Sequence, residues 1–250
     1  MSAPGVRQGA GSCGIFVAGT DTGIGKTLVA RLLVGALVRT GRRIAVMKPV
    51  AAGAVRSPAG LRNDDALALM RAANVDAPYE CINPFCLEPP VSPHIAARSA
   101  AVRIDIGHIV ACFRALADRA DYVVVEGAGG WLAPVSETRS MADVARALGL
   151  PVLLVVGMKL GCLNHAQLTA RAVRADGQTL GGWIANRLDP SLACAEENLA
   201  TLTRLLGCEP LTVLPYCRMP DATGADAIES AVAGRLLRLG ELGTEGPRQA

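Results

Sequence analysis

The 250-residue chain has few aromatic residues, little net charge and no long hydrophobic run. Aromatic residues make up 3% of the chain, and the formal net charge is +3, with basic and acidic residues mixed along it. Nucleic-acid-binding surfaces use basic clusters and stacking aromatics, so we expect no nucleic-acid partner. The most apolar stretch, residues 148–158, contains a proline and two glycines and has the length of a buried strand. It is too short to span a bilayer, so we expect no membrane partner.

The eight cysteines also lack a pattern, since none has paired C-x-x-C spacing. A disulfide framework is not expected in a chain of this size, and a reduced cysteine in a strand or helix acts as a small hydrophobe. A zinc site made by Cys81, Cys86 and a distant histidine stays open on spacing alone. Residues 1–12 contain no apolar signal core and, like residues 240–250, are expected to form a flexible tail, so a cytoplasmic location follows by default.

Apolar runs that predict strands alternate with segments of helical apolar spacing. The predicted strands cover residues 13–18, 43–48, 121–126, 152–157, 180–186 and 211–214. The predicted helices cover residues 26–40, 64–74, 105–119, 140–148, 163–175, 192–206 and 225–239. The strands are continuously apolar, which is typical of strands covered on both faces. We predict an α/β fold: one domain over residues 13–239, with a parallel sheet, helices on both faces and ligands at the carboxyl ends of the strands. Residues 51–63 show little periodicity and predict a long loop beside the site.

A glycine-rich segment follows the first predicted strand, with the sequence GTDTGIGKT over residues 19–27. Strand, glycine-rich turn, Gly-Lys-Thr and helix together predict a P-loop, in which backbone N–H groups surround polyphosphate oxygens. Lys26 would add a positive charge, and the Thr27 hydroxyl can ligate Mg²⁺. The match to G-x-x-x-x-G-K-[ST] is imperfect, because Gly19 lies one residue further out than the pattern asks. The flanking strand and helix disfavour a simple glycine-rich turn, so we predict a bound nucleoside triphosphate.

Polar residues follow other predicted strands. Lys48 ends the second strand, where it could also be a simple exposed lysine. Glu126 ends an apolar strand and enters a glycine-rich turn, and a carboxylate there is a usual partner of nucleotide-bound Mg²⁺. A dinucleotide-binding G-x-G-x-x-G is rejected, because Leu132 occupies the position of the third glycine. Asp64 and Asp65 open a helix, and we expect Asp64 to cap it and Asp65 to be free for metal.

These segments resemble the dethiobiotin synthases in order and spacing over residues 13–225. The segments that carry the resemblance are Gly19-Thr20-Asp21-Thr22 with Gly25-Lys26-Thr27, Lys48-Pro49-Val50, Arg62-Asn63-x-Asp65-Ala66-Leu67, Ser92-Pro93-His94, Glu126-Gly127-Ala128-Gly129-Gly130-Trp131, Lys159-Leu160-Gly161-Cys162 with Asn164-His165, and Gly182-Trp183-Ile184-Ala185-Asn186. Members of this family have a P-loop nucleoside triphosphate hydrolase-like fold, and the longer phosphate loop is normal in them.

The resemblance implies an ATP-dependent ligase of biotin biosynthesis. Its substrates would be 7,8-diaminononanoate, CO₂ and ATP, and its products dethiobiotin, ADP and phosphate. One amine would capture CO₂ as a carbamate, which the γ-phosphate would convert to a carbamic–phosphoric anhydride. The second amine would then displace phosphate and close the ureido ring. The resemblance also implies Mg²⁺ and a homodimer with the substrate site at its interface.

The resemblance also implies a role for each matching residue. The catalytic residues would be Lys48, Lys26 and Thr22. The nucleotide would contact Gly23, Ile24, Gly25, Lys26, Thr27, Asp65, Glu126, Gly127, Gly129 and Asn186. The diamine substrate would contact Thr22, Lys48, Ala52, Gly129, Gly161, Cys162 and Asn164. The ligands of Mg²⁺ would be Thr27, Asp65 and Glu126.

Some of these assignments have alternatives. Asn164 could instead cap a helix, and His94 and His165 are expected to be structural hydrogen-bonding residues, because the mechanism needs no histidine. Ala52 stands where some members of the family have a substrate-binding serine, so we expect modestly weaker diamine binding. Asn198 stands where some have an interface tyrosine that helps to hold the substrate carboxylate.

Other classes of protein fit less well. An ATP-driven switch or partitioning protein generally has a second lysine early in the phosphate loop and a basic binding surface, and both are missing here. An amidotransferase of corrin synthesis would need a further glutamine-hydrolysing domain, for which 250 residues leave no room. A binding module without activity is disfavoured, since both lysines and all the proposed metal ligands are present.

Overall fold

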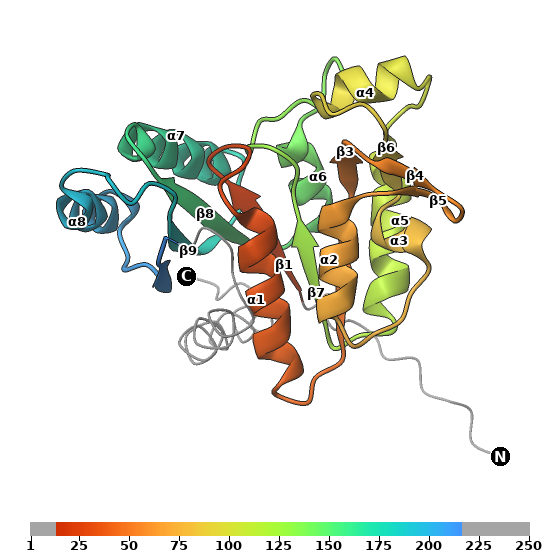
Figure 1. The fold of residues 1–250 in the computed structure, drawn as a ribbon, viewed down its shortest axis with the longest axis horizontal. Helices are drawn as coiled ribbons and strands as arrows, with labels where there is room; N and C mark the ends of the chain where they lie inside the picture. Colours follow the sequence, from red (N-terminus) through yellow and green to blue (C-terminus); the bar gives the residue numbers. More distant parts are fainter. Residues whose placement is uncertain (1–13, 217–250) are drawn as a thin grey trace.

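The computed structural model describes residues 14–216, which form a central six-stranded sheet (Figure 1). The strand order is β10-β9-β8-β1-β7-β2, and each strand is parallel to its neighbours. The strands are β1 (Gly14–Gly19), β2 (Ile44–Met47), β7 (Tyr122–Glu126), β8 (Val152–Met158), β9 (Leu180–Arg187) and β10 (Thr212–Leu214). Every residue of β1, β2, β7 and β8 is buried, as expected for a sheet covered on both faces. The predicted parallel α/β architecture is confirmed.

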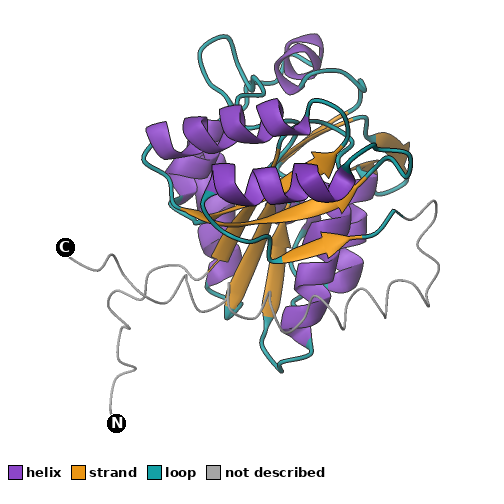
Figure 2. Ribbon diagram, turned by 90° about the vertical axis from the view of Figure 1, so that its left-hand side faces the viewer, coloured by secondary structure: helices purple, strands orange, loops and turns teal. Residues whose placement is uncertain are grey.

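Helices cover both faces of this sheet (Figure 2). The chain runs from β1 outward to β2 and then returns across the sheet, and right-handed crossovers place the helices of the two directions on opposite faces. Helix α1 packs against α2 and α5 packs against α6. The longer helices are α1 (Lys26–Val38), α2 (Asp64–Ala72), α5 (Ile106–Ala117), α6 (Met141–Leu148), α7 (Cys162–Ala175) and α8 (Ala195–Leu206). Their ends agree with the predicted ends to within three residues. The predicted helix 225–239 and both predicted tails lie outside the described residues.

The predicted long loop over residues 51–63 is wrong. Strand β3 (Val50–Ala52) pairs in parallel with β6 (Phe85–Leu87), and β4 (Val55–Ser57) forms an antiparallel hairpin with β5 (Gly60–Arg62). Three-residue strands are too short to show alternation, and all of β4 is exposed, so no apolar pattern marks it. Two short helices, α3 (Tyr79–Ile82) and α4 (Pro93–Ser99), were also not predicted, for the same reason of length.

Most of the core is aliphatic, but six polar side chains among residues 14–216 are buried with it. These are Lys26, Lys48, Asn63, Asn83, Glu126 and Asn186. A buried polar group destabilises the fold unless it is paired, so these residues are candidates for a role other than hydrophobic packing. Lys26 starts the helix after β1, and Lys48 follows β2. Glu126 ends β7 and Asn186 lies next to the end of β9, so four of the six lie at the carboxyl edge of the sheet. Among residues 14–216 no helix is long and apolar enough to cross a membrane.

Candidate active site

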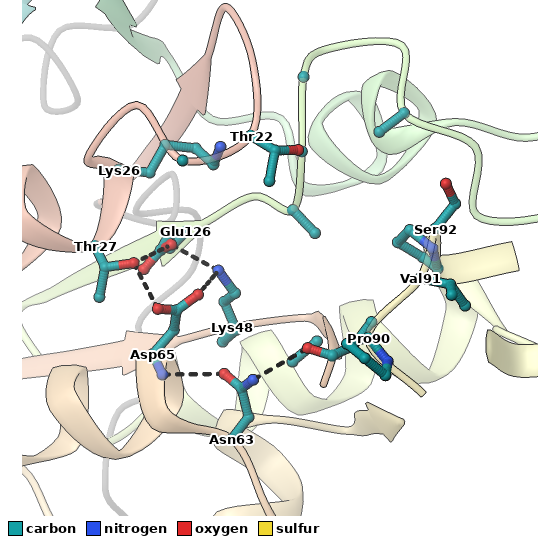
Figure 3. Close-up of a pocket in the computed structure, with 18 of the residues that line it drawn as sticks. Thr22, Lys26, Thr27, Lys48, Asn63, Asp65, Pro90, Val91, Ser92 and Glu126 are labelled. Atoms are coloured by element: carbon teal, nitrogen blue, oxygen red, sulfur yellow. Dashed lines mark hydrogen bonds and ion pairs between the residues drawn. The ribbon is translucent and has the colours of Figure 1, made fainter. Parts of the chain in front are cut away.

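A cavity of about 710 Å³ lies at the carboxyl edge of the sheet (Figure 3). The phosphate loop, the end of β2, the start of α2 and the turn after β7 all contribute to its wall. The predicted site residues that line it are Thr22, Gly23, Gly25, Lys26, Thr27, Lys48, Ala52, Asp65, Glu126 and Gly129. The structure thus brings together ten residues from four separate parts of the chain. The predicted site residues that do not line it are Ile24, Gly127, Gly161, Cys162, Asn164 and Asn186.

Two carboxylates and one hydroxyl converge at the base of this cavity. Thr27 Oγ1 lies 2.8 Å from Asp65 Oδ1 and 2.8 Å from Glu126 Oε1. A hydroxyl has one proton and cannot donate to both carboxylates at once. Glu126 Oε2 is buried and has no hydrogen-bond partner among the described residues. Three hard oxygen ligands with an unsatisfied carboxylate oxygen fit Mg²⁺, which completes its shell with phosphates and water.

Lys48 neutralises these carboxylates. Its Nζ lies 2.6 Å from Glu126 Oε1 and 2.8 Å from Asp65 Oδ2, and the side chain is nearly fully buried. Burial alone would lower the pKa of Lys48, but the Glu126 and Asp65 carboxylates outweigh it and raise that pKa above its usual value. The same pairing overcomes the effect of burial on Asp65 and lowers the pKa of its carboxyl group. Lys48 therefore carries a firmly held positive charge into the cavity.

Lys26 is also buried, but without a carboxylate partner. It is 6% exposed, and its Nζ donates to the main-chain carbonyl of Asp21 at 2.8 Å. Burial and the neighbouring Lys48 charge lower the pKa of Lys26 from 10.5 to about 8. An ammonium group held in this way is poised for an anion, and a triphosphate entering the phosphate loop would supply one.

The phosphate loop is held from two sides. Asn186 Nδ2 donates to the Ile24 carbonyl at 2.8 Å, and Asp21 pairs with Lys159 at 3.0 Å. Gly25 has a φ of 88°, and a Cβ added there would lie 2.3 Å from Asn186 Nδ2, so this position requires glycine. The side chain of Ile24 is buried, so only its main chain is available to a nucleotide. The contact of Asn186 with a purine edge stays a prediction.

The start of α2 differs from the prediction in one detail. Asn63, not Asp64, caps the helix, because Asn63 Oδ1 accepts the main-chain N–H groups of Asp65 at 3.1 Å and Ala66 at 3.3 Å. Asparagine and aspartate serve equally well as caps, so the sequence alone did not decide between neighbouring positions. This cap leaves the Asp65 carboxylate pointing at Thr27 and Lys48, and its role as a metal ligand stays a prediction.

The turn between β8 and α7 lies apart from the cavity. Helix α7 begins after Gly161, whose φ is 96°, so Asn164 lies inside the helix and the alternative that it caps α7 is wrong. Cys162 is 2% exposed and packs in the core, which leaves its main chain but not its thiol for a ligand. Leu160 and Asn164 are exposed. The predicted contact of this turn with substrate stays a prediction.

The two histidines do not show the predicted bonding. His94 Nδ1 is buried without a hydrogen-bond partner among residues 14–216, and α4 has no side-chain cap. The main chain of His165 accepts the Thr169 hydroxyl at 2.8 Å. The zinc site left open above is not formed within the described residues, where no group of three or more histidine, cysteine or acidic side chains could hold a metal ion.

A second cavity, of about 480 Å³, was not predicted from the sequence. It opens beside the ends of β8, β9 and β10 and is lined by Met158, Arg187, Asp189, Pro190, Leu192, Ala195, Val213, Pro215 and Tyr216. Arg187 directly follows Asn186 and pairs with Glu196 of α8. Polar and proline residues just past strand ends were the available signal. The segment Pro90–Pro93 also lines the first cavity without having been predicted to do so.

Comparisons with known proteins agree with this geometry. A family model described as an AAA domain matches residues 13–222. The ATP-dependent dethiobiotin synthetase of Aromatoleum aromaticum is 48% identical over 221 residues, which cover 88% of this chain and 96% of the relative. The ATP-dependent dethiobiotin synthetase of Xanthomonas oryzae is 47% identical over 210 residues, covering 84% and 93%.

Solved structures confirm the predicted P-loop nucleoside triphosphate hydrolase-like fold. The cell division protein MinD of Aquifex aeolicus matches with a TM-score of 0.55 at 15% identity, covering 94% of this chain and 99% of that chain. MinD of Pyrococcus furiosus, titled a cell division ATPase, matches with a TM-score of 0.52 at 17% identity, covering 91% and 99%. At such low identity the likeness shows the fold alone.

Proposed function

The chain belongs to the ATP-dependent dethiobiotin synthetase family, and from that premise we propose that it closes the ureido ring of dethiobiotin from 7,8-diaminononanoate, CO₂ and ATP. It is an ATP-dependent ligase with an AAA-domain fold. One observation carries the proposal: Lys26, Lys48, Thr27, Asp65 and Glu126 meet in a single cavity. Phosphoryl transfer depends on positioning and charge neutralisation more than on covalent help, and this set supplies both.

The proposed reaction has three steps. One amine of the diamine adds to CO₂ and loses a proton to give a carbamate. A carbamate oxygen attacks the γ-phosphorus of ATP, the bond to the β-phosphate oxygen breaks, and ADP leaves behind a carbamic–phosphoric anhydride. The second amine then attacks the carbonyl carbon, the bond to the phosphate oxygen breaks, and the ring closes with release of phosphate and a proton.

The residues divide this work by their charge and position. Lys26 would bind the β- and γ-phosphate oxygens, and Lys48 would face the carbamate and the γ-phosphate as charge moves between them. Thr22 and Gly129 line the same cavity and would contact the diamine. Thr27, Asp65 and Glu126 would hold Mg²⁺ (Figure 3). The metal, when bound, supplies the charge that neutralises the triphosphate oxygens.

The remaining parts of the ligands need other surfaces. We assign the purine to the second cavity, because it adjoins Arg187 and lies past the strands that follow the phosphate loop in the sheet. The carboxylate end of the diamine would reach the turn of Gly161 and Asn164 in a second protomer. Leu160 beside that turn is 92% exposed, which supports a homodimer that covers it. A cytoplasmic location suits such an enzyme of small-molecule synthesis.

The proposal is tested by incubating the protein with MgATP, bicarbonate and 7,8-diaminononanoate and following ADP and dethiobiotin by mass spectrometry. We expect ADP release that requires the diamine and is matched one-to-one by dethiobiotin. Omission of the diamine and the variant Lys26→Met serve as controls. ADP release that ignores the diamine, with no dethiobiotin formed, would point instead to an ATPase or switch protein with the same fold.

A further inference from the structure

A polar network lies behind the first cavity, between the elements that carry Lys48 and Asp65. Asn83 is 2% exposed, and its Nδ2 donates to the main-chain carbonyl of Lys48 at 2.6 Å. Asn83 Oδ1 accepts the Tyr79 hydroxyl at 3.1 Å. The Tyr79 hydroxyl oxygen in turn accepts the main-chain N–H of Asn63 at 2.8 Å. Three hydrogen bonds therefore connect the end of β2 to the residue that precedes α2.

Asn63 carries the connection on to the metal-binding carboxylate. Its side chain is 7% exposed and lines the cavity (Figure 3). Its Oδ1 accepts the main-chain N–H of Asp65, and its Nδ2 donates to the Ala52 carbonyl at 3.4 Å. The main-chain N–H of Lys48 is also fixed, by the Ile82 carbonyl at 2.7 Å. The network thus holds the main chains of Lys48 and Asp65 without touching either charged group.

The Tyr79 hydroxyl is the central link, because it donates on one side and accepts on the other. A phenol can do both at once, and its proton goes to the Asn83 carbonyl oxygen at 3.1 Å. Cys86 Sγ lies 3.5 Å from the same hydroxyl, and sulfur is the weaker hydrogen-bond acceptor. Partial burial raises the pKa of Tyr79 well above its usual value, so the hydroxyl keeps its proton. The guanidinium of Arg62 lies 4.1 Å over the ring and helps to fix its position.

We propose that Tyr79 and Asn83 are positioning residues, which set the Lys48 ammonium and the Asp65 carboxylate at the separation that phosphoryl transfer requires. Lys48 Nζ and Asp65 Oδ2 lie 2.8 Å apart, and each side chain also contacts a third group, Glu126 or Thr27. A shift of either main chain would disturb all of these contacts together. The part of this inference that concerns turnover rests on the proposed function, whereas the part that concerns metal binding does not.

The test compares Tyr79→Phe, which removes only the hydroxyl, with Tyr122→Phe as a matched control. Tyr122 is 1% exposed and starts β7, at the opposite end of that strand from Glu126. Loss of partners that orient metal ligands typically costs 10- to 100-fold in metal affinity or activity. We expect Tyr79→Phe to weaken Mn²⁺ binding, measured by electron paramagnetic resonance with a non-hydrolysable ATP analogue, by about tenfold or more on that scale. We expect Tyr122→Phe to leave it within about twofold of wild type, since Tyr122 lies at the opposite end of β7 from Glu126.

Turnover and coupling complete the test. In Tyr79→Phe we expect kcat to fall with little change in the KM for ATP, because the phosphate loop is not altered. Asn83→Leu should act on the same link, so the double variant should be no more than about twofold worse than the poorer single variant. The inference would be overturned if Tyr79→Phe left the metal affinity and kcat unchanged and only lowered the urea unfolding midpoint, as Tyr122→Phe does. Effects of the two variants that multiply independently would also overturn it.

The two proposals fail in different ways. If the wild-type protein makes no dethiobiotin, the proposed function is wrong, yet Mn²⁺ binding still decides whether Tyr79 positions Asp65. If dethiobiotin is made and Tyr79→Phe binds Mn²⁺ as the wild type does, only the positioning inference is wrong. Should Asn83→Leu fail to fold, the Tyr79→Phe comparison still decides the outcome, since it changes a single atom.

Discussion

The phosphate loop and the carboxylate cluster of Asp65 and Glu126 lie side by side in one cavity. Each contacts one buried lysine, and the pKa values of the two lysines shift in opposite directions. Among residues 14–216 the hydrogen-bond partner of the Lys26 ammonium is a main-chain carbonyl, and the pKa of Lys26 is lowered to about 8. Lys48 is paired with two carboxylates, and its pKa is raised. The two ammonium groups have the same chemistry, so the difference comes from what the fold places around them.

This difference indicates what each region lacks before ligands bind. The buried Lys26 ammonium in the phosphate loop would be stabilised by the negative charge of a triphosphate. The carboxylate cluster has an excess of acceptors around Thr27, including an unpartnered Glu126 oxygen, and it gains from a cation. In the proposed reaction nucleotide and Mg²⁺ would bind as a complex, so one ligand would satisfy both regions at once. Lys48 would keep its charge and remain available to the carbamate.

The largest expected effect is on turnover. We expect Lys26→Met and Lys48→Met each to lower kcat about 100- to 1,000-fold, because each removes a preorganised positive charge from the transferring phosphoryl group. Steady-state assays of dethiobiotin formation measure this. Either variant retaining more than about a tenth of the wild-type rate would contradict the assigned role.

The same two variants should also differ in their free energy of unfolding. Lys48→Met leaves Glu126 buried without a counter-charge, and removing one partner of a buried ion pair costs about 3–5 kcal/mol. Lys26→Met removes a charge that burial already disfavours, so its free energy of unfolding should stay level or rise. Urea unfolding without metal or nucleotide measures both. If the two variants lost equal free energy of unfolding, the two lysines would not differ in how the fold stabilises their charges.

The lowered pKa of Lys26 predicts that nucleotide binding depends on pH. Its pKa is about 8 in the ligand-free protein, and a bound triphosphate should raise it again. Binding should therefore take up a fraction of a proton at about pH 8.5 and much less at about pH 7, where Lys26 is already charged. Calorimetry in two buffers of different ionisation enthalpy measures the uptake, with Lys26→Met as control. Proton release, or equal uptake in the variant, would contradict the prediction.

The smallest effect concerns Ala52, which lines the cavity beside Asn63. We expect Ala52→Ser to lower the KM for the diamine a few-fold with kcat unchanged, because it adds one hydroxyl contact to the substrate. Kinetics with varied diamine measure this. A lower kcat without a gain in affinity would argue that the alanine is required for the chemistry.

The parts of this site that follow strands could be predicted from the sequence. Lys48 directly follows an apolar strand, Glu126 ends one, and Lys26 starts the helix after the phosphate loop of β1. Parallel strands bring such residues to one edge of the sheet. Their pairing could not be predicted, because it depends on β2 lying next to β7, which places Lys48 beside Glu126 although 78 positions separate them. Periodicity predicts strands but not their order.

The residues of the site that were not predicted lie in short elements or irregular segments. Asn83 and Tyr79 belong to a four-residue helix and its end, where no periodicity is visible, and only the bond from Asn83 to the Lys48 carbonyl shows what they do. Asn186 holds the phosphate loop through the Ile24 carbonyl, a role that was not predicted, and its contact with a nucleotide stays a prediction. Polar side chains that bond to the main chain leave no recognisable sequence motif, because every residue has main-chain atoms that could be the partner.

In the proposed reaction a carbamate is activated by phosphoryl transfer, and an isotope experiment can follow the oxygen that is transferred. The protein is mixed with MgATP, the diamine and CO₂ labelled with ¹⁸O at both oxygens, and the reaction is stopped before the label exchanges with water. We predict one labelled oxygen in the released phosphate and the other in the ureido carbonyl of dethiobiotin, because the carbamate oxygen that attacks phosphorus leaves with it. Phosphate that carries no label from CO₂ would show that no carbamate oxygen attacks the γ-phosphate.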